Sequence, residues 1–176
     1  MLRHVSVTSE NIDLATSLQQ KMFPPEENAR RNYEESIDGT TDYSYFIVYD
    51  GDTPVGVSGL YHYDIYPESA WLGWFGILEE YRRKGFGSET VRMFEELARS
   101  RGYRYARLYT DKNDNETAIA FYKSNGYVPE EYNCPEDPIC MTVPLLIFSK
   151  SLDGGELVPW NNRNLFLTEQ IAKQTS

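Results

Sequence analysis

The sequence predicts a mixed α/β or α+β domain built around one central sheet. Its predicted elements run helix, helix and three strands, and then helix, strand, helix and strand, with the two strongest helical patterns each following a strand. A length of 176 residues is typical of one domain and allows a substantial buried core. The hydrophobic content of 40% and the charged content of 25% are those of an ordinary globular protein.

The first half of the chain changes from helical spacing to strand-like alternation. Thr8 and Ser9 can cap a first helix, which Pro24 and Pro25 then end. Aromatic and β-branched residues lie on both sides of an Asp-Gly-Asp turn at residues 50–52, which predicts a hairpin. The elements predicted in this half are helices over residues 8–23 and 26–37, a hairpin over 42–65 and a strand over 70–78.

The second half begins with the clearest helical pattern. Val91 and Phe94 share one face of a helix that starts after Gly87, and Gly102 is a suitable residue to end it. The elements that follow are a strand over residues 103–110, a helix over 115–127 and strand material over 139–152. The tail shows little pattern. We therefore predict a domain over residues 1–152 and a C-terminal extension over 153–176, of unknown role, within a single-domain protein.

Charge and composition exclude several classes of partner. The formal net charge of −10 argues against nucleic acid, which needs a basic binding face. The opening residues lack the apolar run of a signal peptide, and the longest apolar stretch, residues 143–148, is far shorter than the ~20 residues that cross a bilayer. We expect a cytoplasmic protein with no membrane partner. Cys134 and Cys140 have no zinc spacing, so we interpret them as structural thiols and expect no metal.

A basic, glycine-containing loop leads into the helix of the second half. Arg82, Arg83 and Lys84 gather at the helix N-terminus, where the dipole and the free N–H groups already carry partial positive charge. Such an arrangement is stable when an anion joins it. Gly85 and Gly87 allow successive N–H groups to turn inward and hold a phosphate. The alternative is a tight turn with a solvated basic rim.

A second candidate lies in the helix predicted over residues 115–127. Asn115 and Tyr122 are seven positions apart, so they fall on nearly the same helix face, and the small Ala118 lies between them. The amide of Asn115, the space beside Ala118 and the phenol of Tyr122 could together contact an extended ligand along this face. The alternative is that Tyr122 is a filling side chain, because the chain contains 14 tyrosines.

Taken together, these segments resemble the GNAT superfamily of acyl-CoA-dependent N-acetyltransferases. The hexapeptide RRKGFG, Arg82–Gly87, matches the family's cofactor signature Gln/Arg-x-x-Gly-x-Gly/Ala. The segment NETAIAFYKSNGY, residues 115–127, matches its later pattern Asn-x-x-Ala-x-x-x-Tyr-x-x-x-Gly-Phe/Tyr. The resemblance extends over about residues 5–152. It implies a central, mostly antiparallel twisted sheet with a splayed parallel strand pair, flanked by about four helices.

The resemblance also implies roles for individual residues toward acetyl-CoA. Tyr122 would lie by the thioester sulfur and protonate the departing thiolate, and Asn115 would bond the cofactor arm. The backbone of the strand end before the loop would bind the pantetheine amides, and the N–H of Ile77 would polarise the thioester carbonyl. The residues implied at the strand end are Phe75, Gly76 and Ile77, and those implied around the pyrophosphate are Arg82, Arg83, Lys84, Gly85, Phe86, Gly87 and Ser88.

The general base and the acceptor remain open. An alkylamine with a pKa near ~10.4 must lose a proton before it attacks. The strand that often carries the base in this family has none here, and the carboxylates and histidine nearby are Glu79, Glu80, Glu68, Asp64 and His62. We expect proton removal through ordered water. Two acidic segments, residues 23–36 and 129–140, indicate a cationic acceptor, although a solvated acidic surface is the alternative.

The function predicted is acetyl transfer from acetyl-CoA to a primary amine of a small cationic molecule. The alternatives are acetylation of a protein or peptide amino group, and a non-catalytic acyl-CoA-binding module. Tyr122 favours catalysis, because binding alone needs no proton donor. The sequence does not fix the oligomeric state, and a homodimer is compatible with it.

Overall fold

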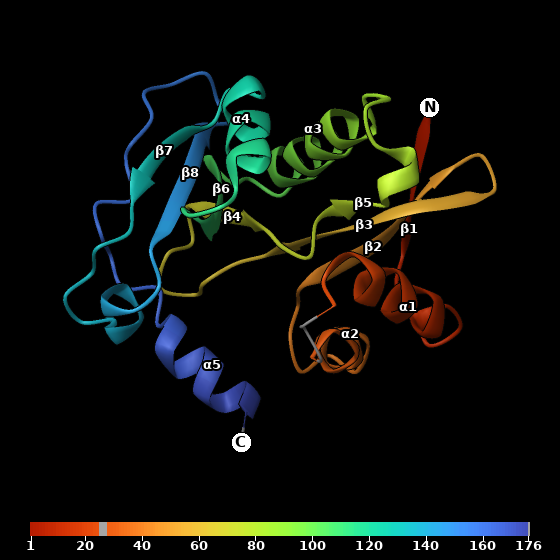
Figure 1. Ribbon diagram of the computed structural model, residues 1–176, viewed down its shortest axis with the longest axis horizontal. Helices are drawn as coiled ribbons and strands as arrows, with labels where there is room; N and C mark the ends of the chain where they lie inside the picture. Colours follow the sequence, from red (N-terminus) through yellow and green to blue (C-terminus); the bar gives the residue numbers. More distant parts are fainter. Residues whose placement is uncertain (25–27, 176) are drawn as a thin grey trace. The chain divides into compact units, whose positions relative to one another are not determined.

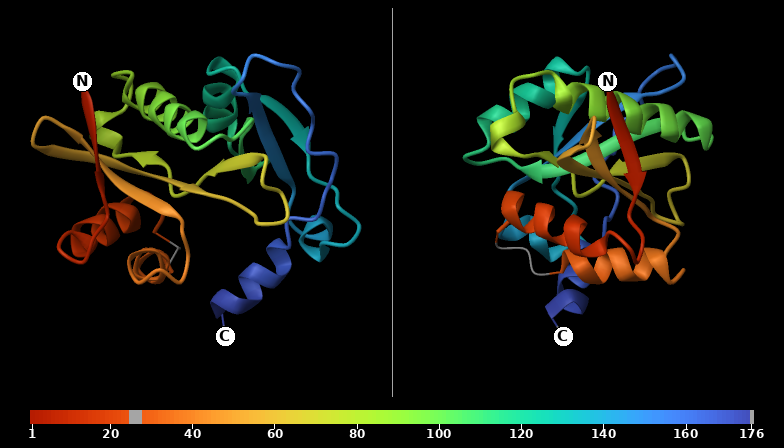
Figure 2. Two further views of the ribbon diagram at one scale, coloured as in Figure 1. Left: turned by 180° about the vertical axis from the view of Figure 1, so that it is seen from behind. Right: turned by 90° about the vertical axis from the view of Figure 1, so that its right-hand side faces the viewer.

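The computed structural model describes residues 1–24 and 28–175, which form two compact units, Met1–Arg104 and Tyr105–Ser176. Figures 1 and 2 show the elements of both units. The elements of unit 1 are β1 (Leu2–Ser6), α1 (Ile12–Met22), α2 (Ala29–Ile37), β2 (Ser44–Asp50), β3 (Thr53–Tyr61), β4 (Ser69–Leu72), β5 (Gly76–Ile77), the 3₁₀ turn η1 (Glu79–Tyr81) and α3 (Phe86–Ser100). Those of unit 2 are β6 (Tyr105–Asp111), α4 (Glu116–Ser124), β7 (Val128–Glu131), the 3₁₀ turn η2 (Pro138–Met141), β8 (Leu145–Ser151) and α5 (Leu167–Thr175).

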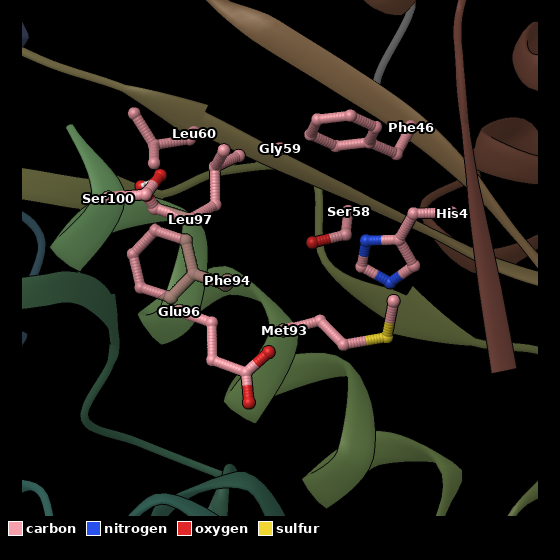
Figure 3. Close-up of a pocket in the computed structure, with 10 residues that line it drawn as sticks. All are labelled: His4, Phe46, Ser58, Gly59, Leu60, Met93, Phe94, Glu96, Leu97 and Ser100. Carbon is pink, nitrogen blue, oxygen red and sulfur yellow. Dashed lines mark hydrogen bonds between the residues drawn. The ribbon is translucent and has the colours of Figure 1, made fainter. Parts of the chain in front are cut away.

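Unit 1 is a three-layer arrangement around an antiparallel sheet. β1 pairs with β2, β2 with β3, and β3 with both β4 and β5. Helices α1 and α2 lie on one face of β2 and β3, and α3 lies on the other (Figures 1 and 2). Because neighbouring residues of a strand point to opposite faces, Ile47 packs in the apolar cluster of α1 and α2, whereas Val48 packs in the cluster that includes Phe86 and Met93 of α3. A cavity of about 350 Å³ remains between α3 and its sheet face (Figure 3).

Unit 2 is a smaller antiparallel sheet with the order β6-β8-β7, and α4 contacts β7. Arg107 of β6 is fully buried there. Its guanidinium donates to Ser149 Oγ at 2.8 Å and to the Val158 carbonyl at 2.9 Å, and it stacks 5.3 Å from the ring of Trp160. The Trp160 side chain is itself 0% exposed. The tail that showed little sequence pattern is therefore packed into this unit.

The predicted elements with clear periodicity are confirmed: both N-terminal helices, the hairpin, α3, β6, α4 and β8 all form. The strands β1 and β7, the helix α5 and the two 3₁₀ turns were not predicted. The strand predicted over residues 70–78 is divided into β4 and β5. Within residues 1–24 and 28–175, no helix has both the length and the apolar character needed to cross a membrane.

Candidate functional site

The first part of the candidate site is the interruption between β4 and β5. β3 pairs with β4 through Leu60 and Leu72, and further along with β5 through Gly56 and Ile77. Trp74 lies in the break with a φ of 43°, a left-handed value that is rare for a bulky residue and that marks local strain. The Gly56 position is crowded, because a Cβ there would lie 2.3 Å from the Gly76 carbonyl oxygen. Glycine thus permits β5 to approach β3.

The register of β5 determines which backbone groups are turned outward. The Leu78 N–H donates to the Val55 carbonyl at 2.8 Å, so these two residues form a hydrogen-bonded pair. Hydrogen-bonded and non-hydrogen-bonded pairs alternate in an antiparallel ladder. The N–H and the carbonyl of Ile77, which is opposite Gly56, are therefore directed away from β3. Arg82 Nε donates to that carbonyl at 2.9 Å, which leaves the Ile77 N–H as the outward donor.

The loop after η1 forms a nest of backbone donors. Arg83 has a φ of 64° and Gly85 a φ of 82°, both in the left-handed region. Alternation of such residues with ordinary ones turns successive N–H groups to the same side. Gly85 is the N-cap of α3 and supplies no side-chain cap. The first N–H groups of the helix, those of Phe86, Gly87 and Ser88, consequently have no intrahelical acceptor and face the N-terminus.

The loop has one side chain that packs into the core and two cationic side chains that are exposed. Phe86 packs with the apolar cluster under α3, so only its backbone is available to a ligand. Arg83 and Lys84 are exposed, and in the described part of the chain neither forms an ion pair. Lys84 Nζ lies 5.6 Å from the centre of the Tyr81 ring. Uncapped N–H groups beside free cations fit a bound polyanion such as a pyrophosphate.

Asn115 lies in unit 2 as the N-cap of α4, but it makes no capping bond with its side chain. Its Nδ2 donates to Thr110 Oγ1 at 2.7 Å and to the Asp111 carbonyl at 3.0 Å. The amide therefore connects α4 to the end of β6, a role that the spacing argument did not reveal. The Oδ1 atom, an acceptor, is the part of this side chain that these two bonds leave for a ligand.

Tyr122 occupies the last turn of α4 and is half-buried. Its ring centre lies 5.3 Å from that of Phe121, 6.3 Å from Tyr127 and 5.4 Å from Phe148. Burial raises the pKa of Tyr122 to about 12. The phenol is therefore protonated throughout the neutral and mildly alkaline range, as a proton donor must be.

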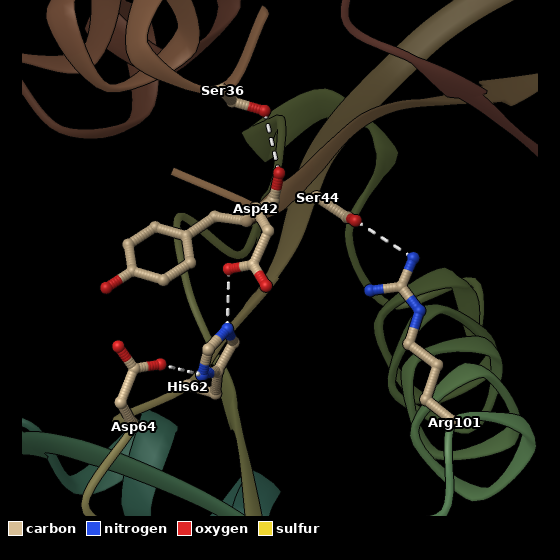
Figure 4. Close-up of polar contacts among 7 residues, drawn as sticks. Ser36, Asp42, Ser44, His62, Asp64 and Arg101 are labelled. Atoms are coloured by element: carbon tan, nitrogen blue, oxygen red, sulfur yellow. Dashed lines mark hydrogen bonds and ion pairs between the residues drawn. The ribbon is translucent and has the colours of Figure 1, made fainter. Parts of the chain in front are cut away.

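Among the base candidates, His62 and Asp64 lie far from β5. His62 comes six positions after Gly56, the partner of Ile77, which is about 20 Å along a strand at ~3.3 Å per residue. There His62 Nε2 lies 2.5 Å from Asp42 and Nδ1 lies 3.4 Å from Asp64 (Figure 4). This arrangement is a local polar cluster and not a base beside the Ile77 N–H.

The other base candidates are also carboxylates. Glu68 precedes β4 at the same end as His62. Glu79 and Glu80 are exposed in η1, directly after β5. In the described ranges, no group of three His, Cys, Asp or Glu residues could hold a metal ion.

Most of the predicted acidic acceptor residues already have partners. Pro25, Glu26 and Glu27 lie outside the described residues. Glu34 pairs with Arg30 at 3.1 Å and Glu35 with Arg31 at 3.0 Å.

The second acidic segment is used for folding. Glu130 accepts the N–H groups of Trp160 at 2.8 Å and Asn161 at 3.0 Å, Glu131 pairs with Lys112, and Asp137 binds the start of α5. These carboxylates are therefore weak candidates for a cation site.

Comparison with known proteins gives a consistent result. The sequence model of the acetyltransferase (GNAT) family matches residues 12–127. The uncharacterized N-acetyltransferase YdgE of Bacillus subtilis (strain 168) is 28% identical over 120 residues, which cover 67% of this chain and 76% of YdgE.

Solved structures share the fold at low identity. An acetyl transferase of Salmonella typhimurium that modifies the N-terminal serine of ribosomal protein L7/L12 matches with a TM-score of 0.70 and 14% identity, over 86% of this chain and 95% of its own. A spermidine N-acetyltransferase SpeG chimera from Vibrio cholerae and hSSAT matches with a TM-score of 0.67 and 18% identity, over 86% of this chain and 95% of its own. The yncA protein of Salmonella typhimurium, a putative acetyltransferase solved with its cofactor acetyl-CoA, matches with a TM-score of 0.65 and 11% identity, over 90% of this chain and 98% of its own. These likenesses confirm the predicted fold class.

Proposed function

The chain belongs to the GNAT acetyltransferase family, and we propose that it transfers the acetyl group of acetyl-CoA to a primary amine of a small molecule in the cytoplasm. The observation that carries the proposal is the pairing of two backbone features in unit 1. These are the outward N–H of Ile77 at the end of β5 and the uncapped N–H nest between Arg83 and Ser88.

Each feature suits one part of acetyl-CoA. The nest and the cations Arg83 and Lys84 would hold the pyrophosphate through charge-assisted hydrogen bonds. The outward edge of Phe75–Ile77 would bind the pantetheine amides as an added strand does, and the Ile77 N–H would stabilise negative charge on the carbonyl oxygen. Asn115 Oδ1 would accept a hydrogen bond from an amide N–H of the arm. Acetyl-CoA supplies the activated acetyl group as a thioester.

Tyr122 is proposed to donate a hydrogen bond from its hydroxyl to the leaving sulfur. Its pKa of about 12 keeps the phenol protonated, but full transfer to a free thiolate of ordinary pKa ~8.5 is uphill for such a group. The hydroxyl therefore acts best as a hydrogen-bond donor whose contribution grows as negative charge gathers on the sulfur. This interaction is stronger in the transition state than in the bound substrate, so it accelerates the reaction.

Proton removal from the amine is assigned to water. His62 lies about 20 Å from the partner of Ile77 in the direction of β3, Asp64 contacts His62, and Glu79 and Glu80 are exposed to solvent. An ammonium of pKa ~10.4 is almost wholly protonated at neutral pH, so it loses its proton to solvent before the amine attacks. The rate should therefore follow the fraction of free amine and rise with pH.

A thiol-release assay with acetyl-CoA tests the proposal. The panel should contain short aliphatic diamines, spermidine, amino acids and a peptide with an N-terminal serine, with a reaction lacking amine to measure hydrolysis. We expect release that depends on at least one small amine, and a product 42 Da heavier than that amine. Release with the peptide alone would replace the small-molecule acceptor by a protein amino group. Tight acetyl-CoA binding without release on any amine would contradict catalysis.

A further inference from the structure

The cavity under α3 is lined by both polar and apolar side chains. In the antiparallel sheet His4, Phe46 and Ser58 point to the same face, and Met93 and Leu97 of α3 line the opposite side of the space (Figure 3). The volume is about 350 Å³. This is within the usual range of ~300–1,000 Å³ for small-molecule pockets. The cavity lies entirely within unit 1.

The imidazole of His4 has unused hydrogen-bonding capacity. Its Nε2 is buried, and no hydrogen bond to it forms within residues 1–24 and 28–175. The ring stacks on Phe46 with centres 5.5 Å apart, which fixes its plane. A buried polar nitrogen without a partner is unfavourable, and most such groups in proteins are satisfied by protein, water or ligand. This nitrogen calls for a partner that the described chain does not supply.

The charge state of the cavity follows from its surroundings. Burial lowers the pKa of His4 to about 4, against the opposing effect of the Glu89 carboxylate, so the ring is neutral near pH 7. The Ser58 hydroxyl, the other polar group of the sheet face, is also neutral. Glu96 contributes to the lining, but its carboxylate points away from His4 and Ser58 (Figure 3). The interior is thus uncharged and offers no compensation for the desolvation of a charged ligand.

We propose that this cavity binds a small neutral molecule with a flat apolar body and one hydrogen-bonding group that pairs with the His4 imidazole. The flat body fits the space beside the stacked rings of His4 and Phe46 and against the Met93 thioether, which makes favourable contacts with aromatic rings. Ordered water is a poorer occupant, because it needs two to four polar partners and most of the lining is apolar. The proposal is independent of acetyl transfer.

Benzyl alcohol, a neutral ring with one hydroxyl, is the probe for the test. The chain has four methionines, so ¹³C-methyl labelling gives few signals, and a Met93→Leu variant assigns that of Met93. We expect the Met93 signal to shift and saturate on titration into the full chain. Benzoate and benzylammonium, which match the probe in shape and carry a charge, should bind at least tenfold more weakly. No saturable shift, or equal affinity for the charged probes, would overturn the proposal.

Two variants locate the binding. His4→Phe keeps an aromatic ring stacked on Phe46 but removes both imidazole nitrogens. It should therefore weaken the binding of benzyl alcohol by about 3- to 10-fold, which is the effect of losing one hydrogen bond. Met93→Trp fills the cavity and should abolish binding, whereas Met141→Trp, at a side chain 87% exposed, should leave it unchanged. If Met93→Trp fails to fold, His4→Phe decides the matter. Unchanged affinity in His4→Phe would contradict the assignment, and these readouts do not depend on enzyme activity.

Discussion

At the scale of single residues, the left-handed backbone of the loop gives the sharpest test of the cofactor site. Gly85 has a φ of +82° and Gly102 a φ of +85°, and a Cβ added at either meets no atom within 4 Å. Alanine at either position should therefore destabilise the protein by a similar ~1 kcal/mol, since both require a left-handed residue. Only Gly85→Ala places a methyl group where a phosphate would approach the N–H nest.

We expect Gly85→Ala to weaken the binding of acetyl-CoA at least tenfold. The Gly102→Ala variant should bind acetyl-CoA with wild-type affinity. Urea unfolding would measure the matched loss of stability, and calorimetric titration would measure affinity. Wild-type affinity in both variants would show that the loop does not hold the pyrophosphate.

Tyr122→Phe tests the proposed hydrogen bond from the phenol to the leaving sulfur. The substitution removes one hydroxyl and keeps the ring that packs against Phe148 at 5.4 Å, so acetyl-CoA affinity should change little. Turnover should fall by roughly 10²–10³, the usual effect of removing one hydrogen-bond donor to charge that develops in the transition state. Steady-state rates with saturating acetyl-CoA provide the measurement. A turnover within about twofold of wild type would refute the assigned role.

The pH profile of the wild type follows from the same residue. Because the pKa of Tyr122 is raised to about 12, the donor stays protonated as pH rises through 10. Turnover should increase with pH as the amine, of pKa near ~10.4, loses its proton, without a falling limb between pH 9 and 11. Rates measured from pH 6 to 11 would show this. A falling limb near pH 10 that disappears in Tyr122→Phe would contradict the raised pKa.

At the scale of elements, α5 depends on one side chain far away in sequence. Asp137 Oδ2 accepts the Leu167 N–H at 3.0 Å, and Oδ1 accepts the N–H and hydroxyl of Thr168 at 3.1 and 2.6 Å. Tyr132 donates to the same carboxylate at 2.7 Å. Burial opposes ionisation, but these hydrogen bonds outweigh it and lower the pKa of Asp137. A carboxylate so held stabilises the fold above its unfolded pKa of ~3.9, and the stabilisation is lost as pH falls through the lower folded value.

Asp137→Asn should therefore reduce the free energy of unfolding by about 1–3 kcal/mol at pH 7, because an amide cannot accept all these bonds. The difference from wild type should narrow as pH falls toward 3, because the stabilisation from the ionised carboxylate diminishes below its unfolded pKa of ~3.9. Urea unfolding at both pH values measures this, with Glu156→Gln, at an exposed carboxylate, as the control. Equal stability of Asp137→Asn and wild type at pH 7 would contradict the role of Asp137.

Helix α5 was not predicted from the sequence, whereas elements with a regular apolar pattern were. Periodicity predicted helices and strands whose apolar face is continuous, such as α3 and the β2–β3 hairpin. It did not predict α5, whose first turn is capped by a residue 30 positions earlier. Nor did it predict the break between β4 and β5, because the left-handed Trp74 has no signature in a run of apolar residues.

The candidate site was predictable to a similar extent. The loop motif located the N–H nest, since glycine spacing reports backbone conformation. The bond from Arg82 to the Ile77 carbonyl and the bond from Asn115 to Thr110 were not predictable, because each depends on side-chain geometry after folding. Both bonds lead to more specific roles: the Ile77 N–H is the outward donor, and Asn115 Oδ1 is the remaining acceptor.

At the scale of the whole molecule, local charge and net charge have opposite signs. The chain carries a formal charge of −10, yet Arg83 and Lys84, which form no ion pair with the residues that the structure describes, lie at a helix N-terminus. A negative protein repels coenzyme A at long range and attracts a cationic amine. Within a Debye length of about 8 Å, however, the local cations and N–H groups dominate. The energy of coenzyme A binding must therefore come from contact with the pyrophosphate.

Calorimetric titration of the wild-type chain with acetyl-CoA and with S-acetylpantetheine, which lacks the pyrophosphate and nucleotide, tests this claim most directly. Charge-assisted hydrogen bonds contribute about 1.5–3 kcal/mol each, so the loss of two should weaken binding by at least ~100-fold. We predict one acetyl-CoA bound per chain, with an affinity at least 100-fold higher than that of S-acetylpantetheine. Equal affinity for the two ligands, or no binding of acetyl-CoA, would contradict the account.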